Sequence, residues 1–304
     1  MPSTRTAIVD ATHRLTRAGV SSPGPDAEML LAHVLGLSRG NLILSREIDE
    51  EQQRRYNDLV EQRCRRRPLQ HIIGSTGFRR LTLAVGPGVF VPRPETELLV
   101  ELAVRYLREI PSPVQVWDLC AGSGAIALSI ATEVPGAQVC AVELSPEAVP
   151  WLQRNVAAHA QLMQAQGSDA HVVEGDATTT PLERAGAEGA HLVVTNPPYI
   201  PDSATPIEPE VTHYDPPLAL YGGPDGLDIV RALAKTAASI LRPGGMFMVE
   251  HADVQGEASP SGVPALLRAQ RDEGNQEVWS TVRDYSDLAG KPRVTTAVRR
   301  GGAL

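Results

Sequence analysis

The sequence has few cysteines, few aromatic residues and no long apolar run. No segment approaches the ~18 consecutive apolar residues that a membrane-spanning helix needs, and the first residues lack the apolar core of a signal peptide. We therefore expect a cytoplasmic protein with no membrane partner. The three cysteines, Cys64, Cys120 and Cys140, are odd in number and show no C-x-x-C spacing, so neither a disulfide framework nor a zinc site is indicated. We expect no bound metal.

Positive charge is also in deficit, although not along the whole chain. The net charge of −8 argues against a protein that binds mainly to nucleic-acid phosphates, and we expect no stable nucleic-acid binding. Residues 1–80 nevertheless contain 13 Lys and Arg against 9 Asp and Glu, a net charge of +4. Residues 81–304 contain 15 against 27, a net charge of −12. The chain therefore has two electrically distinct parts.

The first part is predicted to be helical. Apolar residues in 26–36 recur at steps of three and four, and a glycine follows the last of them. A second helix is expected over 49–67, with acidic residues at its start and arginines at its end, which matches both ends of the helix dipole. The segment RCRRRP (63–68) allows two interpretations, a solvated helix end or a docking patch for an acidic or RNA-associated partner.

The rest of the chain predicts an α/β fold. Short apolar runs such as 114–119 alternate with helical segments such as 125–132 and 145–160, which is typical of a parallel sheet with helices on both faces. Pro150 is expected to kink the last of these helices. The predicted domains are a helical substrate-recognition domain over 1–73, an extended β-containing linker over 74–93, and a catalytic domain with a Rossmann-like sheet over 94–304.

Ligands of an open α/β sheet bind beyond the carboxyl ends of its strands, so the residues that follow each predicted strand are candidate site residues. The first strand leads into Asp118-Leu-Cys-Ala-Gly-Ser-Gly124. Gly122 and Gly124 have no Cβ to block a ligand from the backbone, and the next helix offers free N–H groups. The same loop fits the G-x-G-x-x-A dinucleotide fingerprint, and many helix-capping turns look similar.

Two later strand ends carry carboxylates. Glu143 follows the second strand, where a carboxylate can accept both hydroxyls of a ribose, from NAD or from S-adenosylmethionine. The alternative is a solvated residue before a Ser145 helix cap. Asp176-Ala177 follows the third strand, where the carboxylate could accept from an exocyclic amine such as that of adenine. A plain loop or helix cap explains Asp176 equally well.

The fourth strand ends at Asn196-Pro197-Pro198-Tyr199. The two prolines remove backbone donors and fix φ, so the nearby carbonyls can project into a pocket. Asn196 adds an acceptor and two donors, and Tyr199 adds a flat face. This set suits a planar amide or amino group whose nitrogen is aimed at an electrophile.

With these residues the sequence resembles the class I S-adenosylmethionine-dependent methyltransferases, and among them the N5-glutamine methyltransferases of peptide chain release factors. Methyltransferases of DNA adenine share the NPPY motif, whereas its combination with PRPETE (92–97) is specific to the release-factor family. The resemblance is carried by Gly74, Phe78 and the segments 27–36, 88–101, 118–131, 175–176, 196–201, 221–230, 241–257 and 283–294.

The resemblance implies methyl transfer from S-adenosylmethionine, with S-adenosylhomocysteine as product and no metal. The acceptor would be the N5 amide nitrogen of the glutamine in the GGQ motif of class 1 peptide chain release factors. This methylation would modulate translation termination. Asn196, Pro197, Pro198 and Tyr199 would hold the substrate amide. The implied cofactor-binding residues are Arg93, Glu95, Thr96, Asp118, Cys120, Ala121, Gly122, Ser123, Gly124, Glu143, Asp176, Ala177 and Asn196.

Cys120 departs from the family pattern, because the family usually has a glycine at this point of the loop. A side chain there is costly if the backbone needs a positive φ. Three other functions fit part of the sequence: a DNA adenine-N6 methyltransferase, an NAD-linked dehydrogenase, and a non-catalytic adaptor that binds the cofactor. The first would need a basic channel for phosphates, and the second leaves NPPY without a role.

Overall fold

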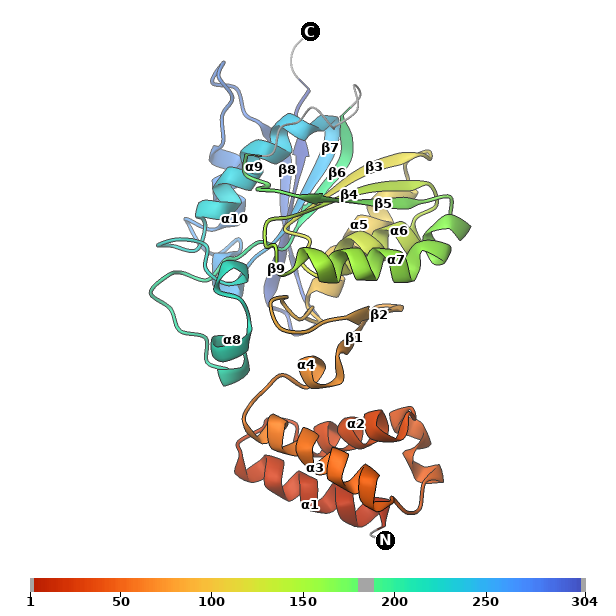
Figure 1. The fold of residues 1–304 in the computed structure, drawn as a ribbon. Coiled ribbons are helices and arrows are strands. Elements are labelled where there is room, and N and C mark those ends of the chain that lie inside the picture. The colour runs from red at the N-terminus through yellow and green to blue at the C-terminus, as the bar shows by residue number, and fades with distance from the viewer. Residues whose placement is uncertain (1–2, 180–188, 302–304) are drawn as a thin grey trace. The chain divides into compact units, whose positions relative to one another are not determined.

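The computed structural model describes residues 3–179 and 189–301, which group into two compact units (Figure 1). Unit 1 contains the residues up to Thr76 together with Val85–Pro87 and Pro206–Tyr214; unit 2 contains Gly77–Ala84, Gly88–Thr205 and the residues from Asp215 onward. The domain limits given above stay a prediction, and their outer ends at residues 1 and 304 lie outside the described residues. The grouping assigns a segment far along the chain, Pro206–Tyr214, to the same unit as the N-terminal helices.

Unit 1 is built from helices around a small apolar core. Tyr56 lies inside this core and donates a hydrogen bond from its hydroxyl to the Ala27 carbonyl across 2.9 Å. The second predicted helix, over 49–67, corresponds to α3, which ends at Cys64, and the short helix α4 begins after Pro68. The first helix of the chain was not predicted. The helices of unit 1 are α1 (Thr4–Arg17), α2 (Pro23–Leu35), η1 (Arg39–Leu44), α3 (Glu50–Cys64), α4 (Leu69–Ile73) and α8 (Pro209–Tyr214).

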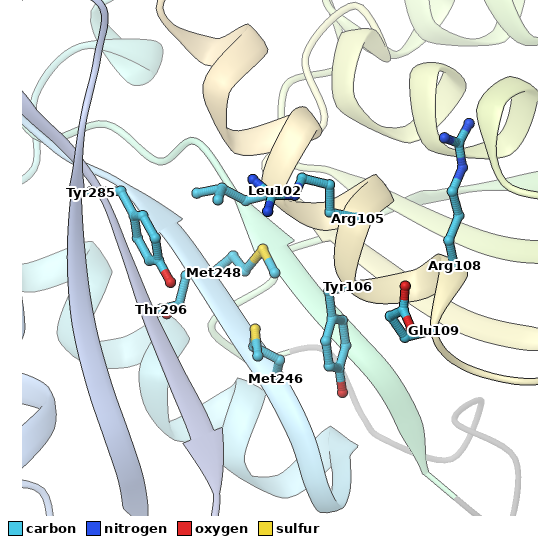
Figure 2. Close-up of a pocket in the computed structure, with 9 residues that line it drawn as sticks. All are labelled: Leu102, Arg105, Tyr106, Arg108, Glu109, Met246, Met248, Tyr285 and Thr296. Atoms are coloured by element: carbon cyan, nitrogen blue, oxygen red, sulfur yellow. The ribbon is translucent and has the colours of Figure 1, made fainter.

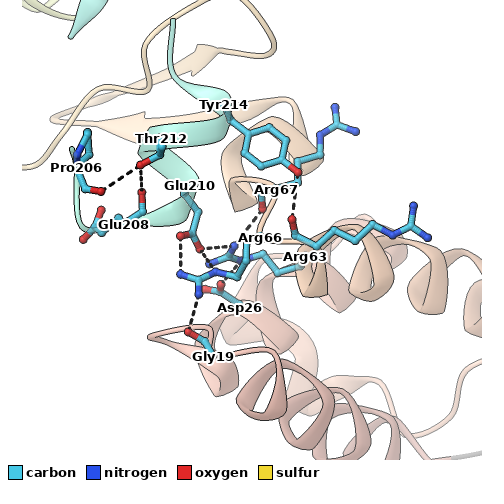
Figure 3. A network of polar contacts seen from close by, with 11 residues as sticks. Gly19, Asp26, Arg63, Arg66, Arg67, Pro206, Glu208, Glu210, Thr212 and Tyr214 are labelled. Carbon is cyan, nitrogen blue, oxygen red and sulfur yellow. Dashed lines mark hydrogen bonds and ion pairs between the residues drawn. The ribbon is translucent and has the colours of Figure 1, made fainter. Parts of the chain in front are cut away.

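The arginines at the end of α3 hold the α8 segment within unit 1 (Figure 3). The buried Arg63 pairs with Asp26 and with Glu210, each across 2.7 Å. Arg66 makes two hydrogen bonds to the same Glu210 carboxylate. These arginines hold the pKa of Glu210 down at about 2, against the opposing effect of its burial. The expectation of a solvated helix end is therefore wrong for Arg63 and Arg66, whereas Arg65 is exposed.

Unit 2 contains a seven-stranded sheet in the order β5-β4-β3-β6-β7-β9-β8. The first five strands in this order run parallel, and β9 and β8 add an antiparallel edge. The mostly parallel sheet confirms the predicted fold class. A separate two-stranded sheet joins β1 (Ser75–Phe78) and β2 (Leu81–Ala84). The strands of the large sheet are β3 (Val114–Leu119), β4 (Ala137–Glu143), β5 (Asp169–Glu174), β6 (Ala190–Thr195), β7 (Leu241–Glu250), β8 (Trp279–Ser286) and β9 (Pro292–Arg299).

Helices cover both faces of the large sheet, with α5, α6 and α7 on one side and α9 and α10 on the other (Figure 1). Successive residues of a buried strand point to opposite cores, so Val116 packs with the first group and Trp117 with the second. The bounds are α5 (Thr96–Arg108), α6 (Ala125–Glu133), α7 (Val149–Ala165), α9 (Asp228–Ile240) and α10 (Val263–Ala269), with short 3-10 turns at Pro217–Ala219 and Asp253–Gln255.

The expected kink at Pro150 is wrong. Helix α7 begins at Val149, which places Pro150 in its first turn, where the missing N–H has no partner inside the helix. Ser145 instead accepts a hydrogen bond from the Ala148 N–H in the preceding turn. Within residues 3–179 and 189–301, no helix combines the length and the apolar character that crossing a membrane requires.

The strand order changes direction between β3 and β6. The chain continues from β3 to β4 and β5 on one side and then places β6 on the other side of β3. Ligands of such sheets bind at this switch point, beyond the carboxyl ends of the strands. The loop after Leu119 and the segment after Thr195 therefore meet where a ligand is expected.

Candidate active site

The loop after β3 is held in a left-handed backbone conformation at three positions. The φ angles of Cys120, Gly122 and Gly124 are 68°, 55° and 87°. A Cβ on Gly124 would lie 2.7 Å from the Leu152 side chain, whereas one on Gly122 would meet nothing within 4 Å. Gly124 is therefore required by conformation and by packing, and Gly122 leaves an open approach to the backbone. Cys120 is a non-glycine residue at a positive φ, and this is the position where the resemblance described above implies glycine.

Buried polar side chains stabilise the loop after β3 and the start of α6. Asp118 is fully buried, and its carboxyl group accepts a hydrogen bond from the Ala127 N–H across 3.0 Å. Burial raises the pKa of Asp118 to about 8, and the nearby charge of Glu143 adds to this effect. Asn155 on α7 donates a hydrogen bond to the Ser123 carbonyl. Asn155 was not predicted, because nothing in the helix pattern marks it.

Glu143 connects the end of β4 to the loop after β3. One carboxylate oxygen accepts from the Gly122 N–H across 2.7 Å, and the other accepts from the Ser145 N–H across 2.8 Å. The side chain is buried, so the alternative of a solvated residue is wrong. Each carboxylate oxygen can accept more than one hydrogen bond, which leaves capacity for ribose hydroxyls.

Asp176 follows β5 and forms a local turn. Its Oδ1 accepts hydrogen bonds from the backbone N–H and the hydroxyl of Thr178, across 2.8 and 2.7 Å. Ala177 is buried in the core beneath α9. The structure thus contains the loop cap considered above, and the contact of Asp176 and Ala177 with an adenine stays a prediction.

The residues Asn196–Tyr199 follow β6 and lie beside the start of α5. The Asn196 side chain donates a hydrogen bond from Nδ2 to the buried Thr96 hydroxyl across 3.1 Å. Arg93, three residues before Thr96, pairs with Asp215 across 2.6 Å. Glu95 is exposed at the helix start. Of the predicted residues in 93–96, the structure therefore brings Thr96 directly to the NPPY segment.

A glycine-rich loop supports the NPPY backbone. A Cβ on Gly222 would lie 2.6 Å from the Pro198 carbonyl oxygen, and one on Gly226 would lie 2.3 Å from the Tyr199 carbonyl oxygen. The Gln255 side chain donates a hydrogen bond to this same Tyr199 carbonyl across 3.0 Å. Burial raises the pKa of Tyr199, so its phenol keeps its proton at neutral pH. Gly222, Gly226 and Gln255 were not predicted as site residues, although the two adjacent glycines at 222 and 223 were a signal.

A buried carboxyl group lies next to Asn196. Glu250 is the last residue of β7 and is 2% exposed. Burial raises its pKa to about 7, while the nearby polar side chains of Thr96 and Asn196 favour its charged form. One oxygen, Oε2, has no hydrogen-bond partner in the described part of the chain. Glu250 was not predicted, because its place beside Asn196 depends on β7 lying next to β6.

The comparisons with known proteins agree with this geometry. Residues 6–74 match the PrmC N-terminal domain, and residues 81–213 match the methyltransferase small domain. The chain is 45% identical over 293 residues to the release factor glutamine methyltransferase of Streptomyces coelicolor, which covers 95% of this chain and 96% of the relative. The chain belongs to the release factor glutamine methyltransferase family. A second member, from Mycolicibacterium smegmatis, is 42% identical over 98% of this chain and 99% of the relative.

Family membership confirms the resemblance stated above and identifies the chain as a methyltransferase. A solved protein-(glutamine-N5) methyltransferase (release factor-specific) from Alicyclobacillus acidocaldarius is 27% identical, covers 71% of this chain and 99% of its own, and superposes with a TM-score of 0.39. Because that superposition is loose, the assignment depends on the sequence relatives. The comparisons support none of the three alternative functions.

In this family member, a pocket lies between α5 and strands β7, β8 and β9, away from the candidate site (Figure 2). Its volume is about 440 Å³, and none of the predicted site residues lines it. Its lining residues are Leu102, Arg105, Tyr106, Arg108, Glu109, Met246, Met248, Tyr285 and Thr296. No cluster of three or more His, Cys, Asp or Glu side chains suited to a metal occurs in 3–179 or 189–301.

Proposed function

We propose that this chain transfers a methyl group from S-adenosylmethionine to the N5 amide nitrogen of the glutamine in the GGQ motif of class 1 peptide chain release factors, and so modulates translation termination. The observation that carries the proposal is the position of Asn196 at the switch point of the sheet, beside the loop that Glu143 supports. The names of the relatives with 45% and 42% identity support the same substrate.

The residues after β3, β4 and β5 suit S-adenosylmethionine as the cofactor. The open side of Gly122 allows close approach to the backbone, and Glu143 retains lone pairs for a ribose. Residues 120–124 would contact the cofactor, with Asp176 and Ala177 near the adenine. When bound, the cofactor supplies an electrophilic methyl group on a sulfonium.

Positioning is the main catalytic contribution that this chain's residues offer. The lone pair of an amide nitrogen is delocalised into the carbonyl, so the nitrogen is a weak nucleophile. The Asn196 side chain and the Pro197 carbonyl can accept hydrogen bonds from the substrate NH2 group and aim its nitrogen, and effective concentration can supply up to about 7–11 kcal/mol of a bimolecular barrier. These hydrogen bonds strengthen as the nitrogen gains positive charge. We assign no general base, and the proton leaves to water.

The helical unit supplies a surface for recognising the release factor in this proposal. Residues 1–80 carry a net charge of +4 and residues 81–304 one of −12, although unit 1 itself has equal numbers of basic and acidic residues once Glu208 and Glu210 are included. We propose that the protein acts in the cytoplasm, without stable binding to nucleic acid and without a membrane partner. Unit 1 would then recognise the release factor, and Asn196–Tyr199 would hold the glutamine.

The test is a labelling experiment with four samples. Purified protein is incubated with methyl-labelled S-adenosylmethionine and a class 1 release factor, the same factor with the GGQ glutamine replaced by alanine, duplex DNA, or buffer alone. We expect label in the first sample only, on the glutamine side chain, located by mass spectrometry of the digested factor. Label in DNA, or equal label in the alanine variant, would overturn the proposed function.

A further inference from the structure

Glu250 and Asn196 lie at the carboxyl ends of neighbouring parallel strands. In the register of β6 and β7, Thr195 is opposite Val249, and Asn196 and Glu250 are the next residues. Val249 points into the core beneath α9, so Glu250 points to the opposite face, where α5 begins. Thr96 in the first turn of α5 completes the group. Three buried or half-buried polar side chains from three elements therefore meet at one point.

The hydrogen bonds in this group distinguish the two ends of the Asn196 amide. Nδ2 can only donate and Oδ1 can only accept. Nδ2 donates to the Thr96 hydroxyl across 3.1 Å, and the Glu250 carboxyl group lies close enough to both side chains for them to favour its charged form. A hydroxyl could satisfy either end of an amide, since it both donates and accepts. An ionised carboxylate only accepts, so it selects the Nδ2 end.

We propose that Glu250 is a positioning residue that fixes the orientation of the Asn196 side chain, with Nδ2 toward Thr96 and Glu250 and Oδ1 left to accept from the substrate amide. The inference rests on the proposed function, because it assigns Oδ1 to the glutamine NH2 group. Glu250 acts through Asn196 and takes no proton from the substrate.

Protonation of Glu250 removes the preference for the Nδ2 end of the Asn196 amide, because a carboxylic acid can donate a hydrogen bond to Oδ1. Burial raises the pKa of Glu250 to about 7, and the charge of Glu95 adds to this, while Arg293 on β9 lowers the pKa. The uncharged Tyr199 phenol lies close by and carries no opposing charge at neutral pH. Turnover is therefore expected to fall as the pH decreases through about 7, as Glu250 gains its proton.

A purely structural role predicts a different outcome. Oε2 of Glu250 is buried without a partner in the described residues, so the carboxylate is an unfavourable choice for stability alone. Replacement by the isosteric amide is then expected to leave the melting temperature unchanged or to raise it. Loss of turnover without loss of stability is the result that a positioning role requires.

The first experiment compares Glu250→Gln with the wild type and with Glu257→Gln, a control at an exposed glutamate that pairs with Arg268. We expect Glu250→Gln to lower kcat roughly 10- to 100-fold, since a small misplacement of a reacting group can cost about that much. The affinity for S-adenosylmethionine should stay unchanged, and the acidic limb of the pH profile should disappear. Wild-type kcat with the acidic limb retained, or an equal loss of cofactor affinity, would overturn the proposal.

The second experiment does not depend on activity. The side-chain amide resonance of Asn196, assigned by its absence in Asn196→Asp, is followed by nuclear magnetic resonance between about pH 6 and pH 8. We expect it to titrate in the wild type and not in Glu250→Gln. A resonance that does not titrate in the wild type overturns the assignment of Glu250, whatever the substrate. A resonance that titrates as expected in a protein without release-factor methylation supports the orientation and rejects only the proposed function.

Discussion

The Gly122 N–H donates a hydrogen bond to the Glu143 carboxylate across 2.7 Å. This contact joins the end of β4 to the loop after β3, and the second carboxylate oxygen binds the Ser145 N–H. Both carboxylate oxygens of Glu143 thus accept hydrogen bonds from backbone N–H groups. A glutamine side chain has only one acceptor oxygen and could not replace both bonds. The orientation of the loop and the proposed binding of a ribose therefore depend on the same ionised group.

We expect Glu143→Gln to weaken binding of S-adenosylmethionine by about 10- to 100-fold. The amide NH2 would face a backbone N–H, and the loss of one hydrogen bond to a charged group is worth about 1.5–3 kcal/mol. Isothermal titration calorimetry with the cofactor measures the change. The matched control is Glu174→Gln. Glu174 is exposed and lies opposite Glu143 on the neighbouring strand β5. Equal affinities of the two variants would contradict the role of Glu143.

We expect Asn196→Ala to reduce turnover far more than cofactor affinity. Removal of one positioned hydrogen-bonding group from a polar transition state lowers kcat by about 100- to 1,000-fold. Steady-state kinetics with a release factor gives kcat, and calorimetry gives the dissociation constant of the cofactor. Asn41→Ala, at an exposed position of unit 1, serves as the control. Comparable turnover in Asn196→Ala would reject the assigned role.

Cys120 gives a test of backbone strain in the cofactor loop. Its φ of 68° disfavours any side chain, so Cys120→Gly should stabilise the protein by up to about 1 kcal/mol if little packing is lost. Cys120→Val should destabilise it, because a β-branched residue is strongly disfavoured at positive φ. Chemical denaturation measures both. Cys140→Gly in β4 is the control and should be destabilising, since Cys140 has no such strain. Destabilisation by Cys120→Gly equal to that by Cys140→Gly would contradict the argument.

Much of the sheet could be predicted from the sequence, because its central strands are buried on both faces. The strand predicted at 114–119 coincides with β3, and the helix predicted at 125–132 differs from α6 by one residue. The antiparallel strands β8 and β9 were missed. In β8 polar residues such as Ser280 and Arg283 interrupt the apolar pattern, and this strand lies at the sheet edge. Helix α1 was missed because most of its buried residues are small or polar, such as Ala7 and Ala11.

The parts of the site that escaped prediction depend on contacts between distant segments. Asn196 and Glu143 follow strands directly, so their position at the strand ends could be predicted from local patterns. Glu250 acquires its partners only when β7 lies beside β6 and α5 begins next to both. The same holds for Arg63, whose partner Glu210 lies 147 positions further along the chain. Glu250 ends a strand and Arg63 begins the RCRRRP segment, but neither local pattern shows which distant residue each side chain meets.

The ion pairs of Glu210 predict the behaviour of the α8 segment. Glu210→Gln removes the charge that faces Arg63 and Arg66, and hydrogen bonds to charged groups contribute about 1.5–3 kcal/mol each. We therefore expect faster hydrogen exchange at Val211 and Thr212, whose amides donate to the Glu208 carbonyl within this segment. Mass spectrometry or nuclear magnetic resonance measures the exchange. The control is Glu208→Gln, because the Glu208 side chain is exposed and forms no ion pair in the described residues.

The acid dependence of this segment follows from the same ion pairs. The pKa of Glu210 is lowered from 4.5 to about 2, so the unfolded state binds more protons than the native state between these values. The stabilisation is fully present above about pH 4.5 and is lost as the pH falls through about 2. Exchange at Val211 and Thr212, corrected for its intrinsic pH dependence, should therefore accelerate on acidification in the wild type and in Glu208→Gln. Glu210→Gln should lack this acid step, and an acid step of wild-type size in that variant would show that other carboxylates hold the segment.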